Sequence, residues 1–224
     1  MLVSKFLLFF FIISTKTFAN YSEVEFKNDL LSPYKNNKSQ QIFIWGSSIT
    51  LALIASRSIW DKVQQDIHER DDLGELSPVG DYAGQMIPNI FYISYQYFAD
   101  DYRRSKLMFK ASLFAGGTTF FLKRLFNEKR PSSSDRLSFP SGHSTTAFAF
   151  AGVIAREHKE WKYPAFALAA LVGYSRMNDN AHYLHDVTMG ATIGLAYAYG
   201  LEEESNIYPI VGKNLFGLQY INRF

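Results

Sequence analysis

The sequence predicts an all-α fold, a single-domain helical bundle of about six core helices. Two observations support this prediction. From residue 42 onward the chain is a series of charge-free apolar segments of 12 to 18 residues, each long enough for at least three helical turns. The 224 residues are also sufficient for one domain with a sizeable core. The expected helices are residues 42–56, 82–99, 111–122, 144–155, 163–175 and 187–201.

The N-terminus resembles a secretory signal peptide over residues 1–19. Lys5 precedes the apolar run 6–13, and Thr17-Phe18-Ala19 has the small-x-small pattern of a cleavage site. The alternative is an uncleaved membrane anchor. The chain contains no cysteine, which fits an envelope protein that avoids disulfide chemistry.

The remaining segments frame the helical domain, residues 42–201. Residues 20–41 are polar and turn-rich, and we expect a loose N-terminal arm there without an assigned function. The acidic stretch 61–81 is typical of a solvated linker. Residues 202–224 form a C-terminal appendage, in which two β-prone runs around Gly212, Lys213 and Asn214 predict a short β-hairpin.

Charge and hydropathy restrict the location of the protein. A formal net charge of +2 does not favour nucleic-acid binding. A membrane-spanning helix needs about 20 largely apolar residues, and the mean hydropathy is −0.11. If the leader is cleaved and six helices span, the basic segments 100–106 and 156–162 face outward, against the positive-inside rule. We therefore expect a cell-envelope protein, periplasmic or associated with a membrane surface; the alternative is an integral inner-membrane protein with a periplasm-facing site.

Residues 123–143 contain the parts of a phosphate-binding site. Lys123 and Arg130 supply fixed cations, which stabilise the charge of a phosphoryl group in transfer. Ser141 precedes an apolar run and suits a helix N-terminus, where free N–H groups and the helix dipole favour an anion. Gly142 allows close backbone approach, and His143 follows just inside the helix.

A second polar group follows about thirty residues later. Arg176 adds a third cation, and His182 and Asp186 are four residues apart. On a helix such residues share a face, so the carboxylate can hold one imidazole nitrogen as N–H while the other remains a nucleophile. This pair corresponds to the Asp–His half of a catalytic triad.

These residues, in this order and spacing, resemble the three-part signature of the type 2 phosphatidic acid phosphatase superfamily. That superfamily also includes bacterial class A acid phosphatases and vanadium haloperoxidases. The three parts are Lys123 followed after six residues by Arg130-Pro131, then Pro140-Ser141-Gly142-His143, then Ser175-Arg176, five residues, His182, three residues and Asp186. The resemblance covers roughly residues 107 to 200.

The resemblance implies a role for each residue. His182 is the expected nucleophile, which forms a phosphohistidine, and Asp186 orients it. His143 is the expected acid for the leaving oxygen and then the base for water. The resemblance assigns phosphate binding to Lys123, Arg130, Ser141, Gly142 and Arg176. It implies no metal and no cofactor.

The implied function is a metal-independent phosphatase that hydrolyses a phosphate monoester or diphosphate, with a membrane lipid as the preferred substrate. A periplasmic acid phosphatase acting on soluble phosphomonoesters is one alternative, and a vanadium-dependent haloperoxidase is another. The expected partners are the phosphorylated lipid or small phosphoester and a membrane surface, without nucleic acid.

Several other residues are interpreted as structural. Phe120, Phe121, Phe148 and Phe150 recur at helical spacing and are expected in the core, with a lipid-lining role as the alternative. His185 beside Asp186 is interpreted as a surface or packing residue outside the site.

Overall fold

The computed structural model describes residues 21–201, 207–212 and 215–220. The predicted leader, residues 1–19, lies outside these residues, as does part of the appendage 202–224.

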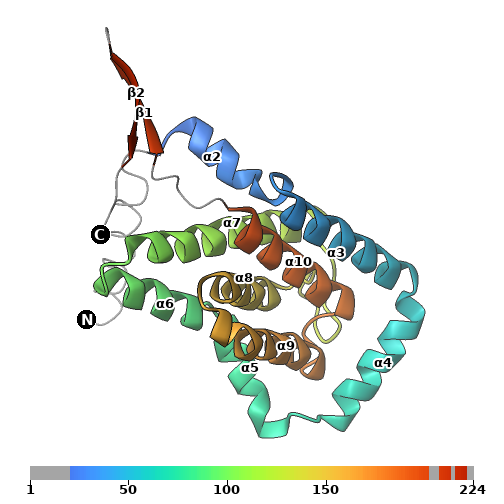
Figure 1. The fold of residues 1–224 in the computed structure, drawn as a ribbon. Coiled ribbons are helices and arrows are strands. Elements are labelled where there is room, and N and C mark those ends of the chain that lie inside the picture. Colours follow the sequence, from blue (N-terminus) through green and yellow to red (C-terminus); the bar gives the residue numbers. More distant parts are fainter. Residues whose placement is uncertain (1–20, 202–206, 213–214, 221–224) are drawn as a thin grey trace.

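One central helix organises the bundle. Helix α8 (Gly142–Glu157) is surrounded by α6 (Ile87–Phe98), α7 (Tyr102–Phe126), α9 (Lys162–Asn178) and α10 (Leu184–Gly200) (Figure 1). Most of the buried residues of α8 are alanine, serine, threonine or glycine, which allow neighbouring helices to approach closely. The predicted all-α class is confirmed, and each predicted segment from 111 onward falls within a single helix apart from a residue at the end of the last.

Helix α3 (Asn37–Ala55) packs against α10 through small and polar residues. Ser39 and Thr50 are its buried side chains, and a Cβ added to Gly46 would collide with Thr192 of α10. On the other side of α3, Trp45 is 67% exposed. The buried side chains of α3 are thus polar, and a large apolar side chain is exposed. An ordinary amphipathic helix has the opposite arrangement.

The predicted helix 82–99 is divided in the structure. Helix α5 (Ser77–Gly84) ends before Gln85, and α6 begins after Met86, whose φ of 66° lies in the left-handed region. A proline in the first turn of α6 supports this restart, because proline fits the first helical positions but interrupts a helix interior.

Two helices form where the sequence indicated irregular chain. Helix α2 (Glu23–Leu30) begins with a capping box between Ser22 and Glu25, which satisfies two otherwise free N–H groups. Helix α4 (Arg57–Arg70) occupies much of the acidic stretch and meets α3 at 88°. The short 3-10 helices are η1 (Ser32–Tyr34), η2 (Gly74–Leu76) and η3 (Lys159–Trp161).

The predicted C-terminal hairpin is present. Strands β1 (Ile207–Gly212) and β2 (Leu215–Tyr220) pair antiparallel, with Gly212 opposite Leu215.

Large apolar side chains cover part of the outer surface. On α6, Phe91 is 72% and Phe98 is 75% exposed, whereas Asn89 and Gln96 of the same helix are buried. On α7, Phe120 and Phe121 are also exposed, so the prediction that they belong to the core is wrong. Their side of α7 faces away from α8.

Phe148 and Phe150 are partly buried and pack against the core, as predicted. Among the described helices none is by itself long and apolar enough to cross a membrane, while α3 and α4 taken together pass that test across their sharp bend.

Candidate active site

His182 and Asp186 form a buried pair at the start of α10. His182 Nδ1 lies 3.3 Å from Asp186 Oδ2, and the two side chains are 2% and 0% exposed. Asp186 lies in the first turn of α10, but His182 lies in the turn before it. The four-residue spacing therefore works across a helix start, rather than along one helical face as expected. The backbone N–H of Tyr183 also donates to Asp186 Oδ2, at 2.9 Å.

Arg130 fixes the tautomer of His182. Its Nη1 lies 3.1 Å from His182 Nε2 and 3.0 Å from the carbonyl oxygen of Ala181. A guanidinium only donates hydrogen bonds, so Nε2 is the acceptor and Nδ1 carries the hydrogen that faces Asp186. Asp135 holds Arg130 in turn, at 2.8 Å from its Nε. The nitrogen expected from the sequence to be the nucleophile thus faces the Arg130 guanidinium.

Ser138 is a site residue that the sequence analysis missed. It is fully buried, and its Oγ donates to Asp186 Oδ2 at 2.6 Å. It lies in the loop between α7 and α8, outside the three recognised motifs. Its only sequence signal is its place between two of the motifs, three residues before Ser141.

The surroundings separate the pKa values of the pair. Burial lowers the pKa of His182 to about 4, assisted by the charges of Lys123 and Arg130 and opposed by Asp186. Burial acts to raise the pKa of Asp186, but hydrogen bonding and charge from His182, followed by His185 and Ser138, bring it below its ordinary value. At neutral pH the pair is a neutral imidazole held by a carboxylate.

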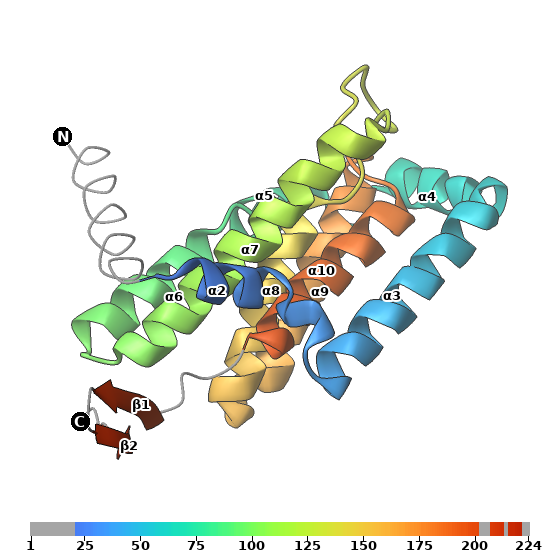
Figure 2. The ribbon, with the colours of Figure 1, turned by 90° about the horizontal axis from the view of Figure 1, so that it is seen from above.

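The loop from α7 to α8 joins the C-terminal end of α7 to the start of α8 (Figure 2). Lys123 lies in the last turn of α7. Lys123 Nζ donates to the carbonyl oxygens of Leu137 and Ser138. Burial, followed by the charge of Arg130, lowers the pKa of Lys123 to about 8, so it remains mostly cationic at neutral pH. Its Cε would lie 3.8 Å from a Cβ added to Gly142.

The start of α8 is capped as predicted. Ser141 is the N-cap, and its Oγ accepts from the backbone N–H of Ser144 at 3.4 Å. Helix α8 begins at Gly142, with His143 as its second residue. Helix geometry leaves the first N–H groups without intrahelical acceptors, which makes this end suitable for an anion.

His143 lies among the cations of the site. Burial lowers its pKa, Arg176, Arg130 and Lys123 lower it further, and Asp81 opposes them. All three predicted cations are therefore near enough to His143 to affect its protonation. His143 Nε2 is buried, and its 3.2 Å separation from Asp81 Oδ1 has ion-pair distance without hydrogen-bond geometry. This nitrogen can therefore still donate to a substrate oxygen.

Arg176 is buried and held by carboxylates on two sides. Its Nη1 lies 2.5 Å from Asp81 Oδ1, and its Nη2 lies 2.9 Å from Asp179 Oδ2. Ser175 Oγ accepts from Nε and Nη2 at 3.2 Å. The structure thus brings every predicted site residue into one cluster and adds Asp81 to it.

His185 is buried behind the pair of His182 and Asp186, so it is a packing residue rather than a surface residue. Its Nε2 lies 3.1 Å from Glu128 Oε1 and 3.4 Å from Asp186 Oδ1, and Arg57 Nη1 lies 2.8 Å from the same Glu128 oxygen. Carboxylates only accept, so Nε2 carries the hydrogen. Glu128, His185 and Asp186 offer ligand atoms within 4.8 Å of one another. Glu128 is already engaged by a hydrogen bond from His185 and by the Arg57 ion pair, whereas Asp186 Oδ1 lies at ion-pair distance from His185 without a hydrogen bond.

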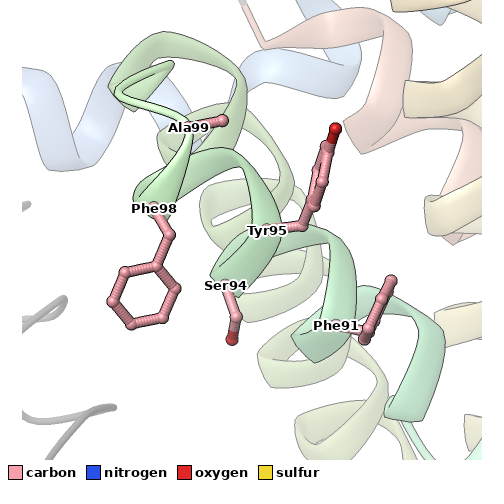
Figure 3. A pocket seen from close by; sticks show the side chains of 5 residues that line it. All are labelled: Phe91, Ser94, Tyr95, Phe98 and Ala99. Atoms are coloured by element: carbon pink, nitrogen blue, oxygen red, sulfur yellow. The ribbon is translucent and has the colours of Figure 1, made fainter.

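A shallow apolar hollow lies elsewhere, along α6. It is lined by Phe91, Ser94, Tyr95, Phe98 and Ala99 (Figure 3). It contains no cationic group and shares no residue with the cluster, so it is not the phosphate site.

Comparison with known proteins agrees with this cluster. Residues 106–202 match the family model of the PAP2 superfamily. Over this region, the chain is similar to the PAP2 superfamily. The resemblance inferred from the three motifs is therefore confirmed. The match contains all eight predicted site residues and omits α3, α4 and α5.

Two relatives of this chain are named as lipid A phosphatases. The chain is 27% identical over 206 residues to a lipid A 1-phosphatase of Porphyromonas gingivalis, covering 78% of the chain and 46% of that relative. It is 31% identical over 112 residues to a lipid A 4′-phosphatase of Helicobacter pylori, covering 44% of the chain and 56% of that relative. The chain thus spans about half the length of these relatives.

A solved structure shares the fold. The crystal structure of LpxE from Aquifex aeolicus aligns with a TM-score of 0.56 at 24% identity, covering 62% of this chain and 92% of that one.

Proposed function

We propose that this PAP2 protein is a metal-independent phosphatase that removes a phosphate from a membrane lipid through a phosphohistidine intermediate. The observation that carries the proposal is the orientation of His182. Its neutral Nε2 faces the Arg130 guanidinium, while Asp186 holds Nδ1–H on the other side of the ring. A lone pair aimed at a cation that binds phosphate is the arrangement required for attack on phosphorus.

The first chemical step transfers the phosphoryl group to His182. The Nε2 lone pair forms a bond to phosphorus as the bond from phosphorus to the lipid oxygen breaks. His143 donates its Nε2 proton to that oxygen, so the lipid leaves as an alcohol. Asp186 stabilises the positive charge that develops on the His182 ring, and Lys123 and Arg130 stabilise the phosphoryl oxygens.

The second step restores the enzyme. Neutral His143 removes a proton from water, and the water oxygen bonds to phosphorus as the phosphorus–nitrogen bond breaks. Inorganic phosphate leaves, His182 recovers its lone pair, and His143 is protonated again for the next turnover.

A lipid substrate is supported by the surface beside the site. Lys123 belongs to the last turns of α7, where Phe120, Phe121, Leu125 and Phe126 are all more than half exposed. Exposed apolar groups of this size mark contact surfaces. With a phosphate bound at Lys123, these side chains can accommodate acyl chains. The named activities of the relatives make lipid A the first substrate to test. This surface also supports a location at a membrane of the bacterial envelope.

The test measures phosphate release by the full chain in detergent from lipid A, phosphatidic acid, phosphatidylglycerophosphate, a prenyl diphosphate and p-nitrophenyl phosphate, with and without a chelator. We expect chelator-resistant release that is fastest from one of the lipids. Faster hydrolysis of p-nitrophenyl phosphate than of every lipid would favour a soluble phosphoester. Halide oxidation with peroxide and vanadate, without phosphate release, would identify a haloperoxidase instead.

The intermediate is tested by brief reaction with radiolabelled substrate and denaturation. A label that is stable in base and labile in acid, present in wild type and absent from His182→Ala, supports phosphohistidine. His158→Asn is the matched control, since His158 contacts Tyr92 away from the cluster. Unchanged turnover in His182→Ala would contradict the proposed nucleophile.

A further inference from the structure

Asp81 of α5 contacts two residues of the active site at once. Its Oδ1 lies 2.5 Å from Arg176 Nη1 and 3.2 Å from His143 Nε2. Its Oδ2 accepts a hydrogen bond from Gln85 Nε2. Asp81 lies outside the matched region 106–202 and outside the three motifs.

We propose that Asp81 is a positioning residue of the active site. It holds the Arg176 guanidinium in place for the substrate phosphate, and its negative charge stabilises the protonated form of His143 that the first step requires. The proposal rests on the phosphatase function proposed above.

The electrostatic part of the proposal follows from the groups around His143. Arg176 from α9, Lys123 from α7 and Arg130 from the following loop all disfavour a proton on His143. Asp81 from α5 favours it. The N-terminal part of α10 contributes Asp186, paired with a neutral His182, and α6 carries no charged residue. Without Asp81, His143 would lose the negative charge that favours its protonated form against the three cations.

The packing of α5 keeps Asp81 in this position. A Cβ added to Gly84 would lie 2.7 Å from His143 Cβ, and one added to Gly80 would collide with Ser175. The backbone before Asp81 therefore packs directly against Ser175, and the backbone after it packs directly against His143. Such close contact restricts any outward movement of the carboxylate.

A carboxylate beside Arg176 could instead compete with substrate phosphate, since both are anions. The two roles predict opposite effects of Asp81→Asn. Loss of a competitor strengthens the binding of substrate and inorganic phosphate, whereas loss of a positioning residue lowers kcat and weakens or preserves that binding.

The experiment compares Asp81→Asn, Asp81→Glu and Glu75→Gln with wild type. Glu75→Gln removes the same charge from an exposed position in the same segment. One readout is kcat and KM across pH. The other readout does not depend on turnover: it is the pKa of His143, measured by NMR of the imidazole nitrogens in the full chain in detergent. The His143 signal is assigned as the one that is absent from His143→Gln. Thermal melting shows whether each variant is folded.

We expect Asp81→Asn to lower kcat about tenfold, less than the roughly 10²–10⁴ expected for loss of an acid itself. Because the imidazolium loses a nearby negative charge, the pKa of His143 falls, and the basic limb of the rate profile moves to lower pH. Asp81→Glu should keep part of the wild-type kcat and part of the wild-type pKa of His143. Glu75→Gln should match wild type in both quantities.

An unchanged His143 pKa in folded Asp81→Asn overturns the proposal, as does tighter binding of inorganic phosphate with undiminished kcat. If wild type hydrolyses none of the phosphates, the proposed function fails, but the NMR titration still tests the contact of Asp81 with His143.

Discussion

The hydroxyl of Ser138 donates to Asp186 Oδ2, the same carboxylate oxygen that faces His182 Nδ1. One oxygen therefore accepts from a buried serine, an imidazole and a backbone N–H. These donors favour the ionised form of a fully buried carboxylate, and the ionised carboxylate holds the His182 ring by its Nδ1–H.

Ser138→Ala tests this relationship. A hydrogen bond to a charged group is worth about 1.5–3 kcal/mol, so we expect a comparable loss in the free energy of unfolding and a kcat about tenfold lower. Urea unfolding and steady-state kinetics measure the two effects. Ser112→Ala is the control, because Ser112 is also buried but accepts from Asn89 instead; it should lower stability without a specific loss of kcat. Equal kcat in the two variants would contradict the role of Ser138.

The buried neutral His182 predicts a loss of stability in acid. The pKa of His182 is about 4 in the folded protein, compared with the ordinary histidine value of 6.5 that applies to the unfolded chain. The unfolded chain therefore binds the proton more readily. The stability contribution of the neutral ring is complete above pH 6.5 and is lost as pH falls toward 4. The full difference is about 3 kcal/mol in order of magnitude. In urea unfolding between pH 7 and 4, His182→Asn should show a smaller acid loss than wild type; parallel curves would refute the assignment.

Gly46 predicts a steric effect between α3 and α10. In Gly46→Ala the new methyl group meets Thr192, and overpacking of this kind costs about 1–3 kcal/mol. Gly116→Ala is the matched control, since a Cβ at Gly116 has nothing within 4 Å and helix propensity favours alanine by about 0.5–1 kcal/mol. The midpoint of thermal unfolding should thus fall in Gly46→Ala and rise in Gly116→Ala.

The exposed rings of α7 predict a substrate-dependent effect. The double substitution Phe120→Ser and Phe121→Ser should lower hydrolysis of a lipid phosphate about tenfold or more, since burying one large apolar side chain contributes about 1.5–3 kcal/mol. Hydrolysis of p-nitrophenyl phosphate should stay within twofold of wild type. Equal losses on both substrates would show that the rings serve folding rather than lipid binding.

The candidate site could be predicted from the sequence because its residues lie at fixed spacings at helix ends and in the loop between α7 and α8. Ser141 caps α8 and His143 follows it, so local helix chemistry alone places both. The cations Lys123, Arg130 and Arg176 belong to the same motifs, and each contributes positive charge at His143.

Other features depend on tertiary contacts that leave no local pattern. Asp81 and Glu128 lie in charge-rich segments that resemble solvated surface until α5 and α4 are folded against the site. Phe120 and Phe121 have the helical spacing of core residues, but periodicity does not say which face of α7 is covered. The division between α5 and α6 depends on the left-handed Met86, a conformation that the sequence does not mark.

The pair formed by Arg57 and Glu128 has a consequence for how this domain can be cut. A fragment limited to residues 106–202 would retain every motif residue but would leave Glu128 without its cation from α4 and Arg176 without its carboxylate from α5. Both partners of these pairs lie upstream of the fragment, so a fragment that keeps the candidate site's ion pairs intact must extend upstream to include α4 and α5.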